Sequence, residues 1–178
     1  MNIEFGPRGV VMIDDAIITN RNFRGEENEY NDKGKRNFSL LIQDENIANM
    51  LMEDKNKYGV GWNVKIREPK NPGDKPSMYL KVNVRFDNFP PDIYLISDGE
   101  VIEINENNAH RLDEIDIATV NLDIRPYDGI SKGRDKAPFR TAYVKNMEII
   151  QDVNRFRAKY KGVRRVEEPE DMFFGEDE

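Results

Sequence analysis

Tyrosine and basic side chains recur at every second position in four stretches of the sequence, a pattern with the chemistry to bind a single-stranded nucleic acid. Cations pair with phosphates, while flat rings stack on bases that no complementary strand covers. Each stacked ring contributes about 1 to 3 kcal/mol without reading base identity, so such a surface accepts many sequences. The candidate binding residues in these stretches are Lys65, Arg67, Tyr79, Lys81, Arg85, Arg125, Tyr127, Tyr143 and Lys145.

Apolar residues occupy the intervening positions of the same four stretches. Successive side chains of a β strand point to opposite faces of a sheet, so this alternation predicts strands over residues 62–67, 78–86, 118–127 and 140–150. Lys, Arg and Tyr also suit a merely solvated sheet face, and this ordinary interpretation stays open beside the binding one. The residues expected in the core are Val64, Ile66, Met78, Leu80, Val82, Val84, Phe86, Val120, Leu122, Ile124, Ala142 and Val144.

Two polar segments, residues 20–36 and 127–139, are rich in the same residue types. The first is longer than a packing connection normally requires. In OB-type barrels, loops at the barrel rim close over a bound nucleic acid, so we expect both segments to contribute to binding. The candidates that they add are Phe23, Tyr30, Lys132 and Arg134.

Strand patterns dominate the chain, and only two short segments have the pattern of a helix. Residues 8–19 and 37–43 predict further strands, while Asp44 and Asn105 are suited to cap the two helices. Two helices are too few for the alternating βαβ units of a parallel sheet. We therefore predict a mainly β fold, an OB-type antiparallel barrel of five or more strands with two short helices. A β-sandwich is the alternative.

Charge is distributed unevenly along the 178 residues. The formal net charge is −7, from 27 Lys and Arg against 34 Asp and Glu. The segment 167–178 carries seven acids and no base, which accounts for the whole surplus, and the preceding segment 154–166 is basic. Such neighbouring segments can neutralise each other or exchange partners when a polyanion binds. We predict an OB-like nucleic-acid-binding domain over residues 1–153, a basic segment over 154–166 and a disordered acidic tail over 167–178.

The absence of Cys and the single His limit the chemistry available to the chain. They exclude disulfide scaffolds, zinc fingers, iron–sulfur clusters and any site that needs two imidazoles. Asp113, Glu114 and Asp116 offer carboxylates for a metal, but they suit the charged end of a helix better. Trp62 alternates with core positions and His110 lies in a predicted helix, so neither indicates catalysis. We expect no cofactor, no metal and no enzymatic activity.

The N-terminal residues lack the apolar segment of a signal peptide, and no window approaches about 18 consecutive apolar residues. We expect a soluble cytoplasmic protein with no membrane partner. In the acidic tail, Phe173 and Phe174 stand between acids, where rings serve no purpose in solubility alone. We interpret them as partner-docking residues; the alternative is an acidic solubility tail whose rings fold back on the body.

The chain resembles phage-type single-stranded-DNA-binding proteins, which combine an OB-like barrel with an acidic, aromatic C-terminal tail. The resemblance implies that the tail occupies the DNA groove when DNA is absent and recruits replication enzymes when displaced, with Phe173 and Phe174 as docking rings. The chain departs from the family pattern because GEDE follows these rings. The segments that carry the resemblance are RNFSLLIQ, GWNVKIR, MYLKVNVRF, IYLIS, LDEIDIATVNLDIRPYDG and TAYVKNMEI, within residues 36–150.

These observations lead to one leading hypothesis and two competitors. The leading one is a non-enzymatic protein that coats single-stranded DNA in phage replication or recombination, in the host cytoplasm, with replication or recombination proteins as partners of the tail. Self-association stays open. A structural or assembly protein of the virion is the alternative, and a carboxylate-dependent nuclease is the third class.

Overall fold

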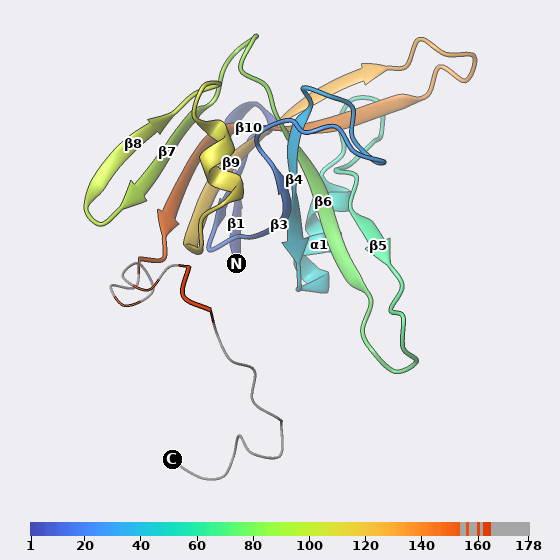
Figure 1. Cartoon of the computed structure of the whole chain (residues 1–178). Coiled ribbons are helices and arrows are strands. Elements are labelled where there is room, and N and C mark those ends of the chain that lie inside the picture. Colours follow the sequence, from blue (N-terminus) through green and yellow to red (C-terminus); the bar gives the residue numbers. More distant parts are fainter. Residues whose placement is uncertain (154–155, 157–159, 161, 165–178) are drawn as a thin grey trace.

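The computed structural model describes residues 1–153, 156, 160 and 162–164. The acidic tail with Phe173 and Phe174, and most of the basic segment 154–166, lie outside the described residues. The described chain forms one strongly bent β sheet with a single α-helix, α1 (Glu45–Glu53), packed against it (Figure 1). Among the described residues, no helix is long and apolar enough to cross a membrane.

Ten strands make up the sheet, and two short 3-10 turns, η1 (Pro7–Gly9) and η2 (Ala109–Asp113), interrupt the connections. The second helix predicted from the sequence is therefore the 3-10 turn η2. The strands are β1 (Asn2–Phe5), β2 (Val11–Asp14), β3 (Ile17–Asn22), β4 (Arg36–Ile42), β5 (Lys65–Arg67), β6 (Ser77–Val84), β7 (Asp92–Ser97), β8 (Glu100–Ile104), β9 (Ile117–Ile130) and β10 (Pro138–Gln151).

The main path through the sheet runs in the order β1, β2, β9, β10, β6, β4 and β3. β5 adds to β6, β7 adds to β10, and β8 adds to β7. The predicted mainly β class is confirmed, but the sheet is not closed into a barrel. The expectation of an entirely antiparallel sheet is wrong, because β10 pairs in parallel with both β6 and β7. Both parallel pairings arise because β6 and β7 run in the same direction beside β10. After β6 the chain leaves β10 in a loop, and it returns to pair with the next part of β10 as β7.

The N-terminal segment turns a corner that the sequence pattern did not indicate. Residues 8–19 were expected to form one strand, yet the chain bends at Asp15, whose φ of 54° lies in the left-handed region. β2 before the corner pairs with β9, whereas β3 after it pairs with β4 at the far end of the path. The amide of Ala16 donates to the carbonyl of Val120 at 2.8 Å. The corner therefore brings the start of β3, at one end of the sheet path, next to β9.

A β-bulge in β10 changes which side chains face the core. Val144 pairs with Ile124 and Asn146 pairs with Asp123, so Lys145 is the extra residue. The added residue lets Val144 and Met147 both point into the core, and both are buried. The alternation seen over residues 141–145 therefore does not continue through the rest of the strand. The bulge also marks where β10 exchanges β6 for β7 as its neighbour.

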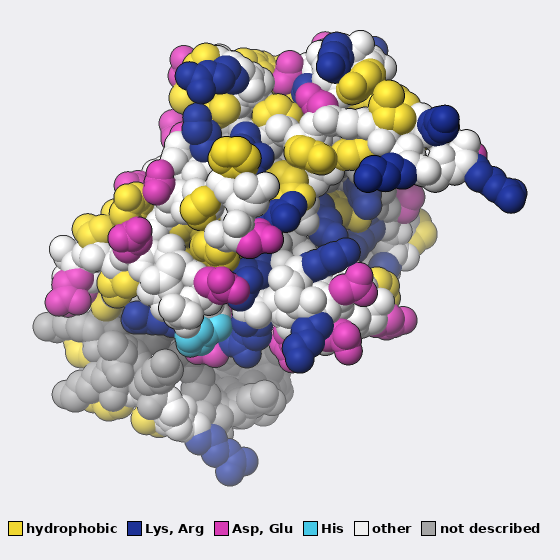
Figure 2. Space-filling model, turned by 90° about the horizontal axis from the view of Figure 1, so that it is seen from above, with side chains coloured by type: hydrophobic (Ala, Val, Ile, Leu, Met, Phe, Trp, Pro, Cys, Tyr) yellow, Lys and Arg dark blue, Asp and Glu magenta, His cyan; other side chains and the backbone are white. Residues whose placement is uncertain are grey.

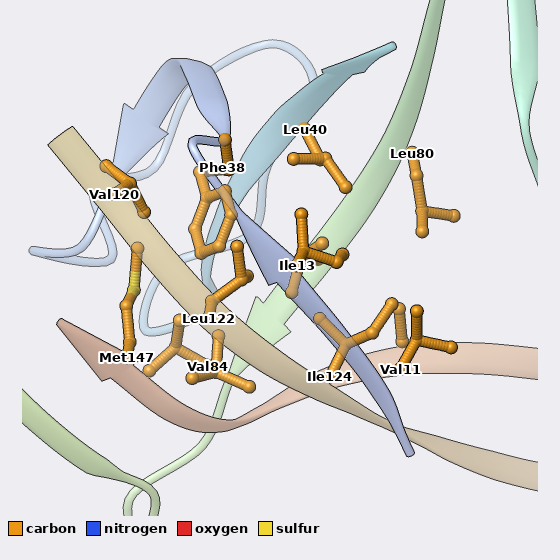
Figure 3. Packing of buried hydrophobic residues seen from close by; sticks show 14 of the residues in the cluster. Val11, Ile13, Phe38, Leu40, Leu80, Val84, Val120, Leu122, Ile124 and Met147 are labelled. Atoms are coloured by element: carbon orange, nitrogen blue, oxygen red, sulfur yellow. The ribbon is translucent and has the colours of Figure 1, made fainter. Parts of the chain in front are cut away.

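Side chains from β2, β4, β6, β9 and β10 converge in one core on the concave side of the sheet (Figure 3). Most of the core residues expected from alternation are buried, including Leu80, Val82 and Ile124. Ile66 is the clear exception, with 56% of its surface exposed. It lies in β5, a three-residue strand that pairs only with β6. A period-two pattern this short does not specify which face becomes covered.

Trp62 and Arg140 fasten the chain after α1 to the long β9–β10 hairpin. Trp62 is buried, as expected, and its Nε1 donates to Asp54 Oδ2 at 2.9 Å. The Arg140 guanidinium lies over the Trp62 ring, 4.9 Å from its centroid, with its Nε 2.8 Å from Asp128 Oδ1. Arg140 also donates to the carbonyl of Asp54 at 2.6 Å. This partly buried network lies near the loop end of the hairpin, where Arg140 pairs with Asp128 two positions before the last pair, Pro138 with Ile130. The hairpin extends from the sheet as an arm (Figure 1).

Candidate nucleic-acid interface

Strand pairing brings the alternating tyrosines and cations of β9, β10 and β6 side by side on the sheet face opposite the core. In the register of the sheet, Arg125 stands opposite Tyr143, Tyr127 opposite Thr141, and Tyr143 opposite Asn83. Directly opposed residues share a face of the sheet, so these side chains form one surface. We call this side of the sheet the outer face.

Tyr143 is at the centre of this surface. The Arg125 guanidinium lies 5.0 Å from the centroid of the Tyr143 ring, and the Tyr127 ring meets it edge-on at 6.3 Å. The pKa of the Arg85 guanidinium is raised, mainly by hydrogen bonding to Asp87 and to a smaller extent by the Tyr143 hydroxyl. Rings and fixed positive charges in alternation are what a stacked base and its phosphate require. We call these four residues, Tyr143, Tyr127, Arg125 and Arg85, the Tyr143 cluster.

A hollow of about 470 Å³ lies beside the cluster. Its lining is cationic, and Lys and Arg side chains gather in the centre and on the right of the molecular face seen in Figure 2. Two acids, Asp87 and Glu106, reach the same hollow. The residues that line it are Gly34, Lys35, Arg36, Lys81, Asn83, Val84, Arg85, Phe86, Asp87, Glu106, Thr141 and Tyr143.

The acids in the hollow engage two of its cations. Asp87 accepts from Arg85 Nε at 3.0 Å and from Arg85 Nη2 at 3.2 Å, and this hydrogen bonding lowers the pKa of the Asp87 carboxyl. Glu106 Oε1 lies 4.0 Å from Arg36 Nη1. All of these groups except Arg36 are largely exposed, so solvent screens the pairs and a phosphate can compete for the cations.

A second group of predicted residues extends the outer face along β6 to β5. Tyr79 is two residues from Lys81 on β6 and therefore shares its face, and it stands opposite Lys65 of β5. The Arg67 guanidinium lies 5.6 Å from the centroid of the Tyr79 ring. The structure thus brings Lys65, Arg67 and Tyr79 together as a second ring-and-cation site on the same face.

Two connections project beyond the sheet beside the hollow. Lys132 and Arg134 are exposed at the tip of the β9–β10 arm, and Tyr30 is 87% exposed in the connection between β3 and β4. The side-chain amide of Asn31 donates to the carbonyls of Glu26, Asp32 and Lys35, at 3.0, 3.0 and 2.9 Å. These bonds order the β3–β4 connection, so Tyr30 is presented by a preorganised loop.

The prediction that Phe23 belongs to the nucleic-acid-binding residues is wrong. Phe23 is fully buried and stacks on Phe38 with the ring centroids 5.4 Å apart, so it offers no face to a base. The predicted polar loop begins too early, because β3 continues to Asn22 and carries the ring into the core. Lys145 is exposed at the bulge but is not part of the hollow's lining.

The carboxylates considered for a metal have structural partners instead. Asp113 accepts from the backbone amides of Phe23 and Arg24 at 2.7 and 3.0 Å, and the Arg24 guanidinium pairs with Asp113 and Glu114. These contacts hold the start of the β3–β4 connection against η2. Within the part of the chain that the structure describes, no group of three or more His, Asp or Glu residues is arranged to hold a metal.

Sequence reasoning missed Phe86 and Asn83 as members of the site. Phe86 was assigned to the core, but it is half-buried, lines the hollow and has the Arg36 guanidinium 5.4 Å from its ring centroid. It lies two residues beyond Val84, the last residue of β6, where strand alternation no longer predicts orientation. Asn83 lies at a position where alternation predicts a side chain on the outer face. Its side-chain amide donates to the carbonyl of Ala142 at 3.2 Å.

The charge of the outer face changes from positive to negative beyond the bulge in β10. A second hollow, of about 460 Å³, is lined there by Asp14, Asp92, Asp123 and Glu148 together with Tyr94 and neutral residues. This acidic region repels a polyanion and therefore bounds the cationic region on the side of β7. Glu148 lies beyond the bulge in β10, so alternation did not place it on this face, and Asp14 and Asp92 come from strands whose pairing the sequence does not specify.

The bent, open β sheet and its cationic, tyrosine-bearing face together define a candidate single-stranded nucleic-acid-binding protein. The chain belongs to a phage family, because residues 4–174 match the family model described as "Putative phage ssDNA-binding domain". The resemblance to phage-type single-stranded-DNA-binding proteins is thereby confirmed. A comparison with curated proteins gave no match.

Solved structures of a single-stranded DNA-binding protein from bacteriophage Enc34 share the fold. The structure in complex with ssDNA has a TM-score of 0.55 at 12% identity, over 87% of this chain and 93% of that chain. Another structure of the same phage protein has a TM-score of 0.53 at 15% identity, over 93% of this chain and 91% of that chain. At these identities the likeness establishes the fold.

Proposed function

We propose that this chain binds single-stranded DNA without sequence preference and coats it during phage replication or recombination. The observation that carries the proposal is the Tyr143 cluster, in which rings and guanidinium groups of β9, β10 and the residue after β6 meet on one sheet face. Family membership supports it, as does the fold shared with the Enc34 protein solved in complex with ssDNA.

The geometry suits a strand of unpaired bases. Tyr143, Tyr127 and Tyr79 offer rings to successive bases, while Lys81, Arg125 and other cations beside them hold the phosphates. Stacking uses the flat face that every base possesses, so it discriminates little between sequences. In a duplex those faces are covered by neighbouring base pairs, so the tyrosines favour single strands.

The proposed role is stoichiometric binding without catalysis. The acidic tail competes with DNA for the cationic face and recruits replication or recombination proteins through Phe173 and Phe174 once DNA displaces it. The protein acts in the cytoplasm of the host cell. The family, which is named for a binding domain, supports a non-catalytic role.

Titration with oligo-dT at two salt concentrations tests the proposal. If six phosphates are neutralised, the logarithm of the binding constant falls with a slope of about −4 against the logarithm of salt concentration. Affinity then drops by about a few hundredfold between 50 and 200 mM salt. Ordered assembly in gel filtration with no binding of oligo-dT at low salt would instead favour the virion protein.

The variant Tyr143→Ala tests the central residue. We expect it to weaken oligo-dT binding about 5- to 100-fold, since one base loses its stacking partner. Tyr94→Ala is the matched control, because Tyr94 is also an exposed tyrosine of the sheet but lines the acidic hollow. Equal affinities for the two variants would contradict the placement of DNA on the cationic face.

A further inference from the structure

Phe89 is an exposed aromatic residue in the connection between β6 and β7. It exposes 77% of its surface, more than any other phenylalanine among the described residues. Its φ of 50° lies in the left-handed region, which is rare for a bulky residue and costs about 1 to 2 kcal/mol. Solvating an apolar ring on a strained backbone gives the fold no benefit, so another role must account for this residue.

The connection that carries Phe89 is held at both ends. On one side Asp87 binds Arg85 through two hydrogen bonds, and Phe86 packs half-buried beneath the Arg36 guanidinium. On the other side Pro90 and Pro91 follow directly, and Pro91 is buried. Proline fixes the backbone φ angle, so the ring starts from a constrained position and loses less conformational entropy on stacking.

The connection begins at the cationic hollow. Phe86 and Asp87, which line the hollow, precede Phe89 by three and two residues. In Figure 1 the β6–β7 connection rises on the upper side of the molecule, where the arm and the β3–β4 connection also project. A strand held by Arg85 and Lys81 therefore passes close to the base of this connection.

We propose that Phe89 is a further base-stacking residue, which receives a base of single-stranded DNA as the strand leaves the hollow beside Arg85. The inference rests on the proposed function and adds a contact outside the sheet face. A nucleotide fits the surroundings better than an apolar partner, because the connection that carries the ring begins at a cationic hollow that attracts phosphate. The strained backbone is then a preorganised feature of the binding surface.

Affinity measurements on Phe89→Ala, with Phe5→Ala as the matched control, test the inference. Phe5 is also an exposed phenylalanine, but it lies in β1 at the far end of the sheet path. We expect Phe89→Ala to weaken oligo-dT binding about fivefold or more, with an unchanged salt slope because no phosphate contact is lost. Phe5→Ala keeps wild-type affinity, and Phe89→Tyr restores the contact. Thermal unfolding of each variant confirms that the fold is intact.

A second measurement uses Phe89→Trp as a reporter. Trp62 is the only native tryptophan and is buried, so a tryptophan at position 89 supplies a separate exposed signal. We expect oligo-dT to quench this emission well beyond the change seen in wild type. Quenching at a tryptophan placed at position 5 should be absent.

The outcomes separate the inference from the function on which it rests. The inference alone is overturned if the wild-type protein binds oligo-dT, Phe89→Ala has unchanged affinity and Phe89→Trp shows no quenching. The exposed ring would then be assigned to contact with a protein partner. Failure of the wild-type protein to bind oligo-dT at low salt overturns both.

Discussion

Asp87 lies inside the candidate interface and competes with phosphate for the Arg85 guanidinium. Arg85 holds its carboxyl through two hydrogen bonds, and the same guanidinium lies next to Tyr143, where a phosphate would be bound. The carboxyl of Asp87 is ionised at neutral pH, and hydrogen bonding from Arg85 lowers its pKa further, so this competition persists under binding conditions. The affinity for DNA is therefore set by the partners of each cation as well as by the number of cations.

Asp87→Asn should strengthen oligo-dT binding by about two- to fivefold at low salt, the range expected when an exposed ion pair is removed. The salt slope should steepen by about 0.7, because Arg85 becomes free to neutralise one more phosphate. Asp92→Asn makes the same change of charge at the acidic hollow and is the control. If Asp87→Asn still gained affinity in an Arg85→Ala background, the gain would not come from releasing Arg85.

Asp128 provides a second residue-scale test, this time of stability. Partial burial raises the pKa of its carboxyl, but hydrogen bonds from Arg140 and Asn56 outweigh that effect, and the net pKa is below the ordinary value. Asp128→Asn should lower the free energy of unfolding by about 1 to 3 kcal/mol at pH 7, since the nearly buried Arg140 loses the nearer of its two charged partners and keeps only Asp54.

The pH dependence follows from the direction of this shift. A carboxyl with a lowered folded-state pKa stabilises fully above its unfolded pKa, and the contribution is lost as pH falls through the folded value. The difference between wild type and Asp128→Asn in urea unfolding should therefore be constant near neutrality and shrink below about pH 4. A difference that grew on acidification would contradict the proposed charge pairing.

At the scale of elements, the β9–β10 hairpin connects the interface to the core. The part on the loop side of the bulge carries Tyr127 and Tyr143 on the outer face and Ala142 and Val144 in the core, and the part beyond the bulge carries the core residues Met147 and Ile149. The bulge at Lys145 separates the two parts and lets each present the required face. β10 therefore keeps core side chains on one face both where it pairs with β6 and where it pairs with β7.

Deletion of Lys145 should be far more damaging than its substitution. Without the extra residue, the segment after the bulge shifts by one position, and Met147 and Ile149 turn out of the core. We expect a loss of about 4 kcal/mol or more, or no cooperative unfolding at all. Lys145→Ala keeps the register and should stay within about 1 kcal/mol of wild type in urea unfolding. Similar stability of the two variants would show that the bulge does not set the register.

At the scale of the whole molecule, charge is divided between surfaces and segments. The cationic hollow and the acidic hollow have different linings, and the sequence of the tail, residues 167–178, holds the entire formal surplus of −7. Electrostatic attraction to DNA is therefore local, although the chain as a whole is acidic. A tethered acidic segment competes most strongly at low salt, where screening is weak.

Removal of residues 167–178 should tighten oligo-dT binding at low salt, with the gain fading as salt rises. A second variant that replaces the seven tail acids by their amides, but retains Phe173 and Phe174, isolates the charge from the rings. We expect it to bind as tightly as the truncated chain in fluorescence titrations. No gain in either variant at 50 mM salt would refute competition by the tail.

The sequence by itself determined the mainly β class, most of the core and which residues of β6, β9 and β10 face away from it, because alternation is a local property that each strand carries. Only the tertiary structure decided that the sheet stays open, that Phe23 is buried, that a bulge at Lys145 reverses the alternation, and that Arg85, Tyr143 and Arg125 meet around one hollow. Those features depend on which strands pair and in which register. Pairing is settled by contacts between distant residues, and no local period encodes it.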